Sequence, residues 1–302
     1  MSIRAKLISL IMARTVRPLF DRVEAITEFR TALGRAERLG AAPPKTISVT
    51  PATIADRPCE WITAPGATPG HVLLYLHGGG YVAGGLDSHR DIAWRLAEAA
   101  AVTVLLVDYR LAPEHPFPAA LDDASACYRY LLDEGFEADK IFIGGDSAGG
   151  GLALATLINL KNLGLPLPAK GILLSPWVDL SLSGDSLTSN GETDVMLTAR
   201  ALHDMARMYL GTRDARAPLA SPLFGDLRGL PPLLVHASSS ELLLSDAERL
   251  VRLVETQGGD IALTVWPRMP HVFQLLASRI PEGRQAITQL AEFLRQPTDR
   301  VN

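Results

Sequence analysis

The chain has little cysteine, and this shortage excludes two classes of protein. Only Cys59 and Cys127 among its 302 residues are cysteines, and neither has a CxxC partner or a nearby histidine. A disulfide framework needs several cysteines, and a structural zinc site needs clustered cysteine and histidine ligands. We therefore expect two unpaired thiols in a reducing compartment, which predicts a cytoplasmic protein.

The sequence also lacks an excess of one charge and any long apolar run. Its net charge is −4, from 29 basic and 33 acidic residues, and the basic residues form no stripe. A nucleic-acid partner is excluded, because such proteins carry a clustered basic surface. No apolar stretch reaches the roughly 18 residues of a membrane span. We therefore predict no membrane span.

The N-terminal segment has too short an apolar run for a signal peptide. Arg4 and Lys6 precede an apolar run at 7–13, but Arg14 and Arg17 interrupt it and no A-x-A cleavage site follows. This pattern favours an amphipathic helix that is retained in the mature protein and covers part of its surface.

The apolar pattern along the chain predicts an α/β protein. Hydrophobic residues make up 47% of the chain, which is enough for a large buried core. Residues 1 to about 40 have helical periodicity, and continuous apolar strands then alternate with amphipathic helices. Strands are expected at 47–50, 59–63, 72–76, 102–108, 140–145, 171–175, 233–237 and 261–266, and helices at 88–100, 118–133, 148–163, 246–257 and 283–295. Such alternation indicates a mostly parallel sheet covered by helices on both faces.

The alternation is interrupted between about 179 and 222, around a helical stretch at 198–209. An insertion at the carboxyl edge of a parallel sheet is placed to form a lid over a site. We therefore expect a helical cap segment at 1–45 and a catalytic domain at 46–302 that carries the cap insertion.

A candidate nucleophile lies in Gly145-Asp146-Ser147-Ala148-Gly149, which has the form G-x-S-x-G. The motif follows an apolar strand and precedes a helix, an arrangement that lifts a serine above the sheet edge in a strained turn. The glycines allow strand and helix to approach closely. Ser147 is therefore the predicted nucleophile, with the Ala148 N–H beside it at a helix N-terminus, where negative charge is favoured.

Glycines upstream predict an oxyanion hole. His77-Gly78-Gly79-Gly80 follows the strand at 72–76, and glycines let backbone N–H groups turn into a site. We expect Gly79 and Gly80 to act with Ala148 as the donors. A phosphate loop is excluded because no G-K-[ST] follows. His77 is predicted to be structural, since a base comes later in the chain in proteins with this serine motif.

The predicted base is His271. It lies in a loop after the last strand, whereas His203 falls in the insertion and His236 in an apolar strand. Loops at strand ends carry catalytic groups on a rigid scaffold.

The predicted acid is Glu241, which follows the strand at 233–237 and precedes His271, the order that the motif requires. A carboxylate here would hold the imidazole tautomer and stabilise the imidazolium. Asp246, five residues further on, stays open as the alternative.

Several long motifs together resemble the bacterial hormone-sensitive-lipase-like esterases of the GDSAG branch, a group of α/β-hydrolases. The matching stretches are HGGGY at 77–81, DYRLAPEHPFPAALDD at 108–123, GDSAGG at 145–150, SPWVDLS at 175–181, SPLFGDLRGLPPLLVHAS at 221–238 and HVF at 271–273. The resemblance implies the α/β-hydrolase fold, a helical cap, no metal or organic cofactor, and a preference for short to medium acyl esters. One departure is the glutamate at 241, thirty residues before His271, where the family usually has aspartate.

These features predict a serine carboxylester hydrolase that acts through an acyl-enzyme on a small-molecule ester. A lactone hydrolase with the same triad is the alternative, because the lid decides which esters enter. A ligand receptor without turnover is a third possibility, since fold does not fix function. A homodimer is also kept open.

Overall fold

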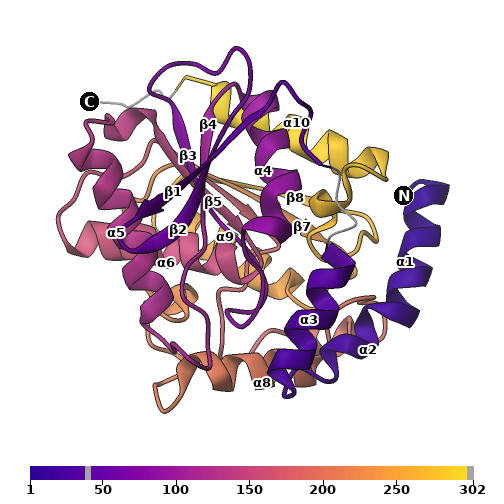
Figure 1. Ribbon diagram of the computed structural model, residues 1–302. Coiled ribbons are helices and arrows are strands. Elements are labelled where there is room, and N and C mark those ends of the chain that lie inside the picture. Colours follow the sequence, from indigo (N-terminus) through magenta and orange to yellow (C-terminus); the bar gives the residue numbers. More distant parts are fainter. Residues whose placement is uncertain (38–41, 298–302) are drawn as a thin grey trace.

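A single sheet organises the protein (Figure 1). The computed structural model describes residues 1–37 and 42–297. The strands are β1 (Ser48–Ile54), β2 (Arg57–Thr63), β3 (Val72–Leu76), β4 (Thr103–Val107), β5 (Ile141–Asp146), β6 (Lys170–Leu174), β7 (Leu233–Ser238) and β8 (Ile261–Trp266). They lie in the order β1-β2-β4-β3-β5-β6-β7-β8. The pairs β1–β2 and β2–β4 are antiparallel and the others are parallel.

The central strands are buried on both faces, so their side chains feed two cores. Alternate residues of β3 divide between them, since Leu74 joins one cluster and Tyr75 the other. The helices are α1 (Ile3–Thr15), α2 (Arg17–Phe20), α3 (Ile26–Glu37), α4 (Leu86–Ala100), α5 (Ala119–Asp133), α6 (Ala148–Asn162), α7 (Ser186–Ser189), α8 (Ala199–Leu210), α9 (Leu244–Thr256) and α10 (Pro281–Arg295). Helices α4 and α10 cover one face, and α5, α6 and α9 cover the other. This is the predicted covered sheet, with the parallel strands in its centre.

The predicted strands and helices are confirmed, with ends that differ by a few residues. The helical N-terminal region divides into α1, α2 and α3, and its expected end at 38–41 lies outside the described residues. The inserted helix expected at 198–209 is α8. No helix in the described part of the chain is long and apolar enough to cross a membrane. Cys59 and Cys127 are both buried and free.

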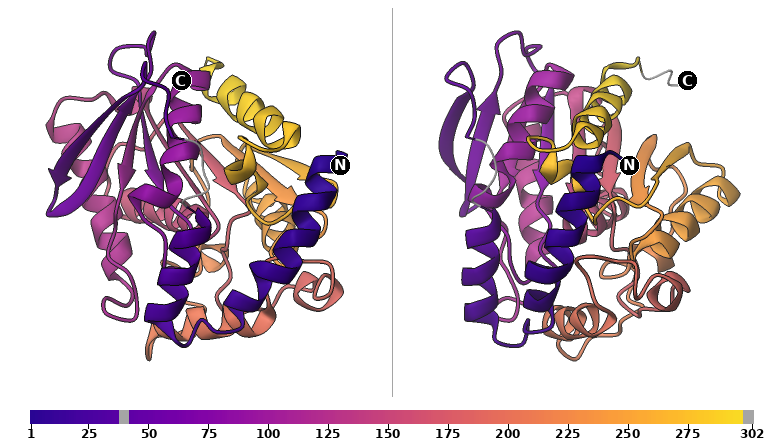
Figure 2. Two further views of the ribbon diagram at one scale, coloured as in Figure 1. Left: turned by 45° about the vertical axis from the view of Figure 1, so that its right-hand side comes forward. Right: turned by 90° about the vertical axis from the view of Figure 1, so that its right-hand side faces the viewer.

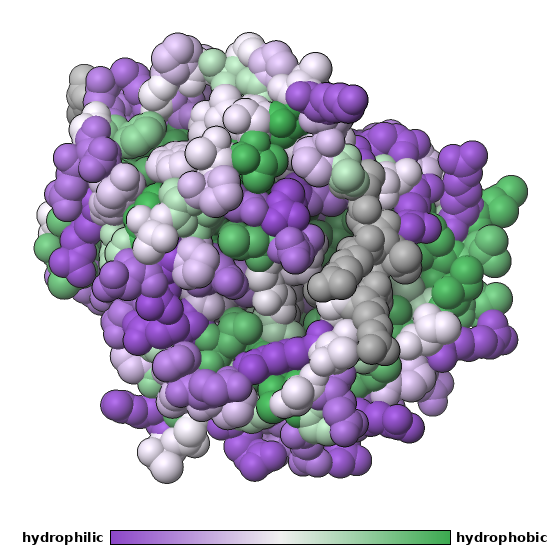
Figure 3. Space-filling view, in the orientation of Figure 1, coloured by the Kyte–Doolittle hydropathy of each residue, from purple (hydrophilic) through white to green (hydrophobic). Residues whose placement is uncertain are grey.

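Helices from two distant parts of the sequence gather at one end of the sheet. Figure 2 shows α1, α2 and α3 beside the inserted segment, below the carboxyl ends of the strands. The inner face of α1 uses Ala5, which is fully buried, and Ile8 for packing. In contrast, Leu7, Leu10 and Ile11 are exposed, and apolar side chains gather at the right-hand edge of the molecule (Figure 3). The division into a cap segment at 1–45 and a catalytic domain stays a prediction.

Glycines allow three backbone segments to meet where β5 turns into α6. A Cβ atom built on Gly149 would lie 2.0 Å from the carbonyl oxygen of Leu76, and one on Gly145 would lie 2.4 Å from the same oxygen. Such distances are far inside van der Waals contact, so any side chain here forces the backbones apart. The close approach of β3, β5 and α6 therefore depends on these two glycines.

Gly149→Ala is expected to lower the free energy of unfolding by at least about 2 kcal/mol, because the added methyl group overpacks a rigid backbone contact. Urea unfolding measures this change. Gly34→Ala in α3 is the matched control, since its Cβ would meet nothing within 4 Å. That control should be neutral or stabilising by up to about 1 kcal/mol. Equal stability of wild type and Gly149→Ala would show that the backbones can separate without cost.

Candidate active site

Ser147 occupies a strained turn between β5 and α6. Its φ is 51° and its ψ is −120°, a conformation that L-residues rarely adopt. The turn is fixed by backbone hydrogen bonds, since the Ser147 N–H donates to the Leu174 carbonyl at 2.8 Å and its own carbonyl accepts from the Trp177 N–H at 2.9 Å. The side chain is 8% exposed. The fold therefore holds the backbone of Ser147 in place at the carboxyl edge of the sheet.

The glycine loop after β3 lies against this turn. Gly79 and Gly80 have φ values of 119° and 64°, a region that favours glycine. A Cβ atom on Gly80 would lie 2.0 Å from the Met205 sulfur, so a side chain here would also displace the flexible end of Met205. Ala148 is the first residue of α6, where a helix leaves the N–H without an intrahelical acceptor. All three residues thus have backbones suited to present N–H groups to a bound oxyanion.

Asp146, beside the candidate nucleophile, ties the glycine loop to β5. Its carboxylate accepts hydrogen bonds from Tyr75 Oη at 3.0 Å and from the Gly78 N–H at 3.1 Å, and His89 Nε2 lies at 3.2 Å. Burial alone would raise the pKa of Asp146, but the charge and hydrogen bond of His89 outweigh it and lower that pKa. Sequence reasoning did not assign this role, although the position of Asp146 inside the serine motif was a usable signal.

His77 is part of the framework of the loop. Its ring stacks on Tyr109 with centroids 4.1 Å apart, and Nδ1 lies 2.7 Å from the Gly78 carbonyl oxygen. Burial and the neighbouring His89 lower the pKa of His77 to about 3, so the ring stays neutral at physiological pH. The Tyr109 hydroxyl donates to the His77 carbonyl at 2.6 Å, which fixes the backbone just before the glycines.

His271 and Glu241 form a buried pair. Nδ1 of His271 lies 2.6 Å from Oε2 of Glu241, and the other carboxylate oxygen accepts from the Ser238 N–H at 2.6 Å. The exposed fractions of the two residues are 3% and 1%. A short charge-assisted hydrogen bond in such a site holds the imidazole in one tautomer and one orientation.

The environment of His271 favours its protonated form. Burial lowers the pKa of His271, but the hydrogen bond and charge of Glu241, together with the charge of Asp194, raise it above the ordinary value. Nε2 has no hydrogen-bond partner among the described residues. His271 and Ser147 line the same cavity. Within the described part of the chain, Nε2 is therefore not engaged in another hydrogen bond.

The hydrogen bonds of Asp246 go to the loop after β6 and not to His271. The Asp246 carboxylate accepts hydrogen bonds from the backbone N–H groups of Val178 and Asp179, both at 2.9 Å. Burial, followed by the charge of Asp179, raises the pKa of Asp246 to about 7. The carboxyl group thus holds the loop after β6.

The two other histidines weighed as bases have unrelated surroundings. His203 is exposed on α8, with 71% of its side chain accessible. His236 is fully buried in β7, and burial lowers its pKa to about 4.

The inserted segment holds the backbone around Glu241. The Asn190 side-chain amide donates to the Glu241 carbonyl at 2.9 Å, and the Asp194 carboxylate accepts from the Leu242 N–H at 2.9 Å. Sequence reasoning missed both residues. Their contacts join positions about fifty residues apart, and no motif marks them.

The cavity beside Ser147 is small and mostly apolar. Its volume is about 40 Å³, whereas ligand pockets commonly have about 300–1,000 Å³. Its apolar walls come largely from the N-terminal helices and the inserted segment, through Phe20, Leu33, Met196, Leu197, Leu202 and Met205. The cavity therefore offers little room beyond a short acyl chain.

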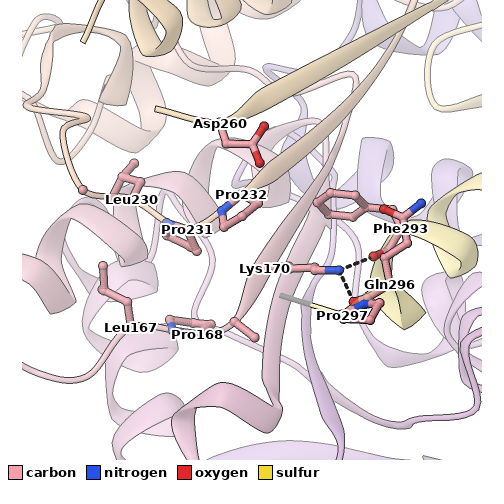
Figure 4. Close-up of a pocket in the computed structure, with 12 residues that line it drawn as sticks. Leu167, Pro168, Lys170, Leu230, Pro231, Pro232, Asp260, Phe293, Gln296 and Pro297 are labelled. Atoms are coloured by element: carbon pink, nitrogen blue, oxygen red, sulfur yellow. Dashed lines mark hydrogen bonds between the residues drawn. The ribbon is translucent and has the colours of Figure 1, made fainter. Parts of the chain in front are cut away.

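A larger cavity of about 560 Å³ lies at the opposite end of the sheet (Figure 4). Lys170 in its wall donates hydrogen bonds to the carbonyls of Phe293 and Gln296, at 2.6 and 2.5 Å. The lysine therefore secures the end of α10, and the cavity contains neither Ser147 nor His271. Among residues 1–37 and 42–297, no group of three or more His, Cys, Asp or Glu side chains is placed to hold a metal ion.

Comparisons with known proteins identify the family of the chain. Residues 73–275 match the family described as the α/β-hydrolase fold. An acetyl-hydrolase of Streptomyces hygroscopicus is 42% identical, with 89% of each chain covered, and an esterase of Acinetobacter venetianus is 38% identical, with 82% of each covered. A solved esterase of the bacterial hormone-sensitive lipase family has a TM-score of 0.87 at 43% identity, covering 92% of this chain and 97% of that one. An esterase/lipase from an uncultured bacterium has a TM-score of 0.89 at 38% identity, with 98% of each covered. The chain therefore belongs to the α/β-hydrolase family and, within it, to the carboxylesterases related to bacterial hormone-sensitive lipases.

Proposed function

We propose that the protein hydrolyses carboxylic esters with Ser147 as nucleophile, His271 as general base and Glu241 as the acid of the triad. The observation that carries this proposal is the buried His271–Glu241 pair, which leaves Nε2 of His271 unpartnered among the described residues, together with the cavity that His271 and Ser147 both line. The strained turn at Ser147 supports it, since such a turn is maintained only where the surroundings enforce it.

The first half of the reaction transfers the acyl group to the serine. Ser147 Oγ attacks the ester carbonyl carbon while Nε2 of His271 takes the hydroxyl proton. The backbone N–H groups of Gly79, Gly80 and Ala148 bind the oxyanion, each contributing about 3 kcal/mol to transition-state stabilisation. The imidazolium then gives its proton to the leaving alkoxide, and the acyl-enzyme remains.

The second half returns the enzyme to its starting state. His271 removes a proton from water, and the resulting hydroxide attacks the acyl carbon on Ser147. Glu241 stabilises the imidazolium in both halves without taking its proton. The tetrahedral intermediate collapses, the acid leaves, and Ser147 Oγ regains its proton from His271.

Short acyl chains suit this site best. The cavity beside Ser147 has a volume of only about 40 Å³ and apolar walls. The related acetyl-hydrolase of Streptomyces hygroscopicus acts, by its name, on acetyl groups. We therefore propose short to medium acyl esters as substrates, with the shortest hydrolysed fastest. The cytoplasmic location and the homodimer stay predictions.

Ser147→Ala is expected to reduce kcat for a short nitrophenyl ester by about 10⁴-fold or more, because no other group can form the acyl-enzyme. A panel of linear esters and lactones, assayed with wild type and variant at matched stability, measures the loss and identifies the preferred class. Turnover by the variant at the wild-type rate would exclude Ser147 as nucleophile.

Replacing each candidate acid by its amide, one at a time, shows which of the two belongs to the triad. Glu241→Gln should lower kcat by about 10³-fold or more, since the amide no longer stabilises the imidazolium. Asp246→Asn should lower kcat only a few-fold, because an amide oxygen still accepts from the N–H groups of Val178 and Asp179. A larger loss from Asp246→Asn than from Glu241→Gln would reverse the assignment.

The pH profile reports the state of His271. A protonated imidazole cannot accept the Ser147 proton, so kcat/KM should fall as the pH drops through the raised pKa of His271, above about 6.5. Glu241→Gln removes the main influence that raises this pKa and leaves burial, which lowers it. The acid limb of the residual activity should therefore move to lower pH, and an unmoved limb would contradict the pairing.

A further inference from the structure

Helix α1 carries most of the large apolar side chains that the protein exposes. Of the seven in the described residues, five lie at the N-terminus, and the other two are Leu163 and Val265. The five are Met1 (38% exposed), Ile3 (85%), Leu7 (58%), Leu10 (50%) and Ile11 (50%). Scattered exposed leucines need no explanation, but a contiguous patch marks a surface that binds something. Figure 3 shows this patch at the right-hand edge of the molecule, over α1.

Basic side chains flank the patch. Positions 3, 7, 10 and 11 form one stripe on a helix, and Arg4 and Lys6 fall on its two sides. Both basic residues are exposed, as is Arg14 in the last turn. Residues 1–20 contain four basic residues and no aspartate or glutamate, although the whole chain has a net charge of −4. An apolar stripe bordered by lysine and arginine side chains can enter a lipid headgroup region, with the basic ends reaching the headgroups.

The opposite face of α1 is fixed to the enzyme. Ala5 and Ile8 pack on the cluster that contains Met269 and Phe273, which flank His271 in sequence. Glu282 of α10 accepts hydrogen bonds from the backbone N–H and the hydroxyl of Ser2, the N-cap of α1. The exposed stripe is therefore presented on a firmly held helix.

The patch is continuous with the cap over the candidate active site. Helix α2 follows α1 directly, and its Phe20 lines the cavity beside Ser147. Arg17 donates hydrogen bonds to the carbonyls of Asp194 and Gly191 in the inserted segment, at 2.6 and 2.7 Å. A surface held against α1 would thus lie beside the helices that line the candidate active site.

We propose that the outward face of α1 is a docking surface for an anionic lipid interface, which holds the enzyme where lipid-soluble esters are concentrated. The apolar stripe enters the boundary between headgroups and acyl chains, and Arg4, Lys6 and Arg14 contact the anionic headgroups. Delivery of esters to Ser147 rests on the proposed function, whereas adsorption to the interface does not depend on the triad.

A second copy of the chain fits this face less well. Two copies of α1 packed by their stripes would bring Arg4, Lys6 and Arg14 of one copy near the same residues of the other. No acidic residue in the helix would balance them, and like charges placed together are destabilising. A phosphate-rich surface supplies the opposite charge.

Vesicle flotation tests the proposal on the full chain. Wild type should float with vesicles of phosphatidylcholine mixed with phosphatidylglycerol, and should remain behind with pure phosphatidylcholine or at high salt. Leu7→Ser should weaken partitioning about tenfold, through lost apolar burial, and Lys6→Gln about fivefold, through lost charge. Leu163→Ser is the matched control because Leu163 is 53% exposed and lies far from α1 in sequence, at the end of α6. It should partition like wild type.

Four results would overturn the proposal: wild type that does not float with either vesicle, wild type that floats equally with both, Leu7→Ser that floats like wild type, or Leu163→Ser that fails like Leu7→Ser. Sedimentation of the proteins without vesicles gives a fifth such result. If wild type is a dimer and Leu7→Ser is a monomer, a second copy of the chain covers this face of α1 instead of a lipid. Thermal melting checks that each variant is folded. Turnover of a water-soluble short ester by wild type tests the esterase function separately, so the two failures are distinguishable.

Discussion

The backbone contact between the ends of β3 and β5 and the start of α6 is the constraint on which the site depends. Gly145 and Gly149 leave no room for a Cβ atom against Leu76, and this contact brings the glycine loop after β3 beside the serine turn. Asp146 then joins the two with hydrogen bonds to Tyr75 and to the Gly78 N–H. The backbone N–H donors of the glycine loop and the nucleophile are thereby held in position before any substrate binds. Such preorganisation is the condition for electrostatic stabilisation of an oxyanion.

Electrostatics complete the site from two further loops at the same carboxyl edge of the sheet. Glu241 and His271 come from the loops after β7 and β8, and burial strengthens the hydrogen bond between them. Because an unpaired carboxylate would be costly here, the second oxygen of Glu241 is satisfied by the Ser238 N–H. The insertion contributes through Asn190 and Asp194, which fix the backbone of this loop. The inserted segment therefore both lines the cavity and supports the pair.

Much of this architecture could be predicted from the sequence, because local signals were strong. Continuous apolar strands indicated the parallel sheet, and the α/β-hydrolase fold is confirmed. The motif around Ser147 and the chain order pointed to His271 and Glu241. Contacts between distant positions were not predictable, such as His89 with Asp146 across fifty-seven residues. Nor was the orientation of α1, because helical periodicity does not tell which apolar residues are covered: Ala5 is buried while Leu7 and Ile11 are exposed.

In the proposed mechanism one serine, activated by the buried pair, carries the acyl group. Labelling with an organophosphate ester tests it most directly, since such reagents phosphorylate an activated serine and the adduct survives peptide mapping by mass spectrometry. We expect a single phosphoryl group on the peptide that contains Ser147, and none in Ser147→Ala. Label on a different residue, or no label under conditions where the enzyme hydrolyses esters, would contradict it.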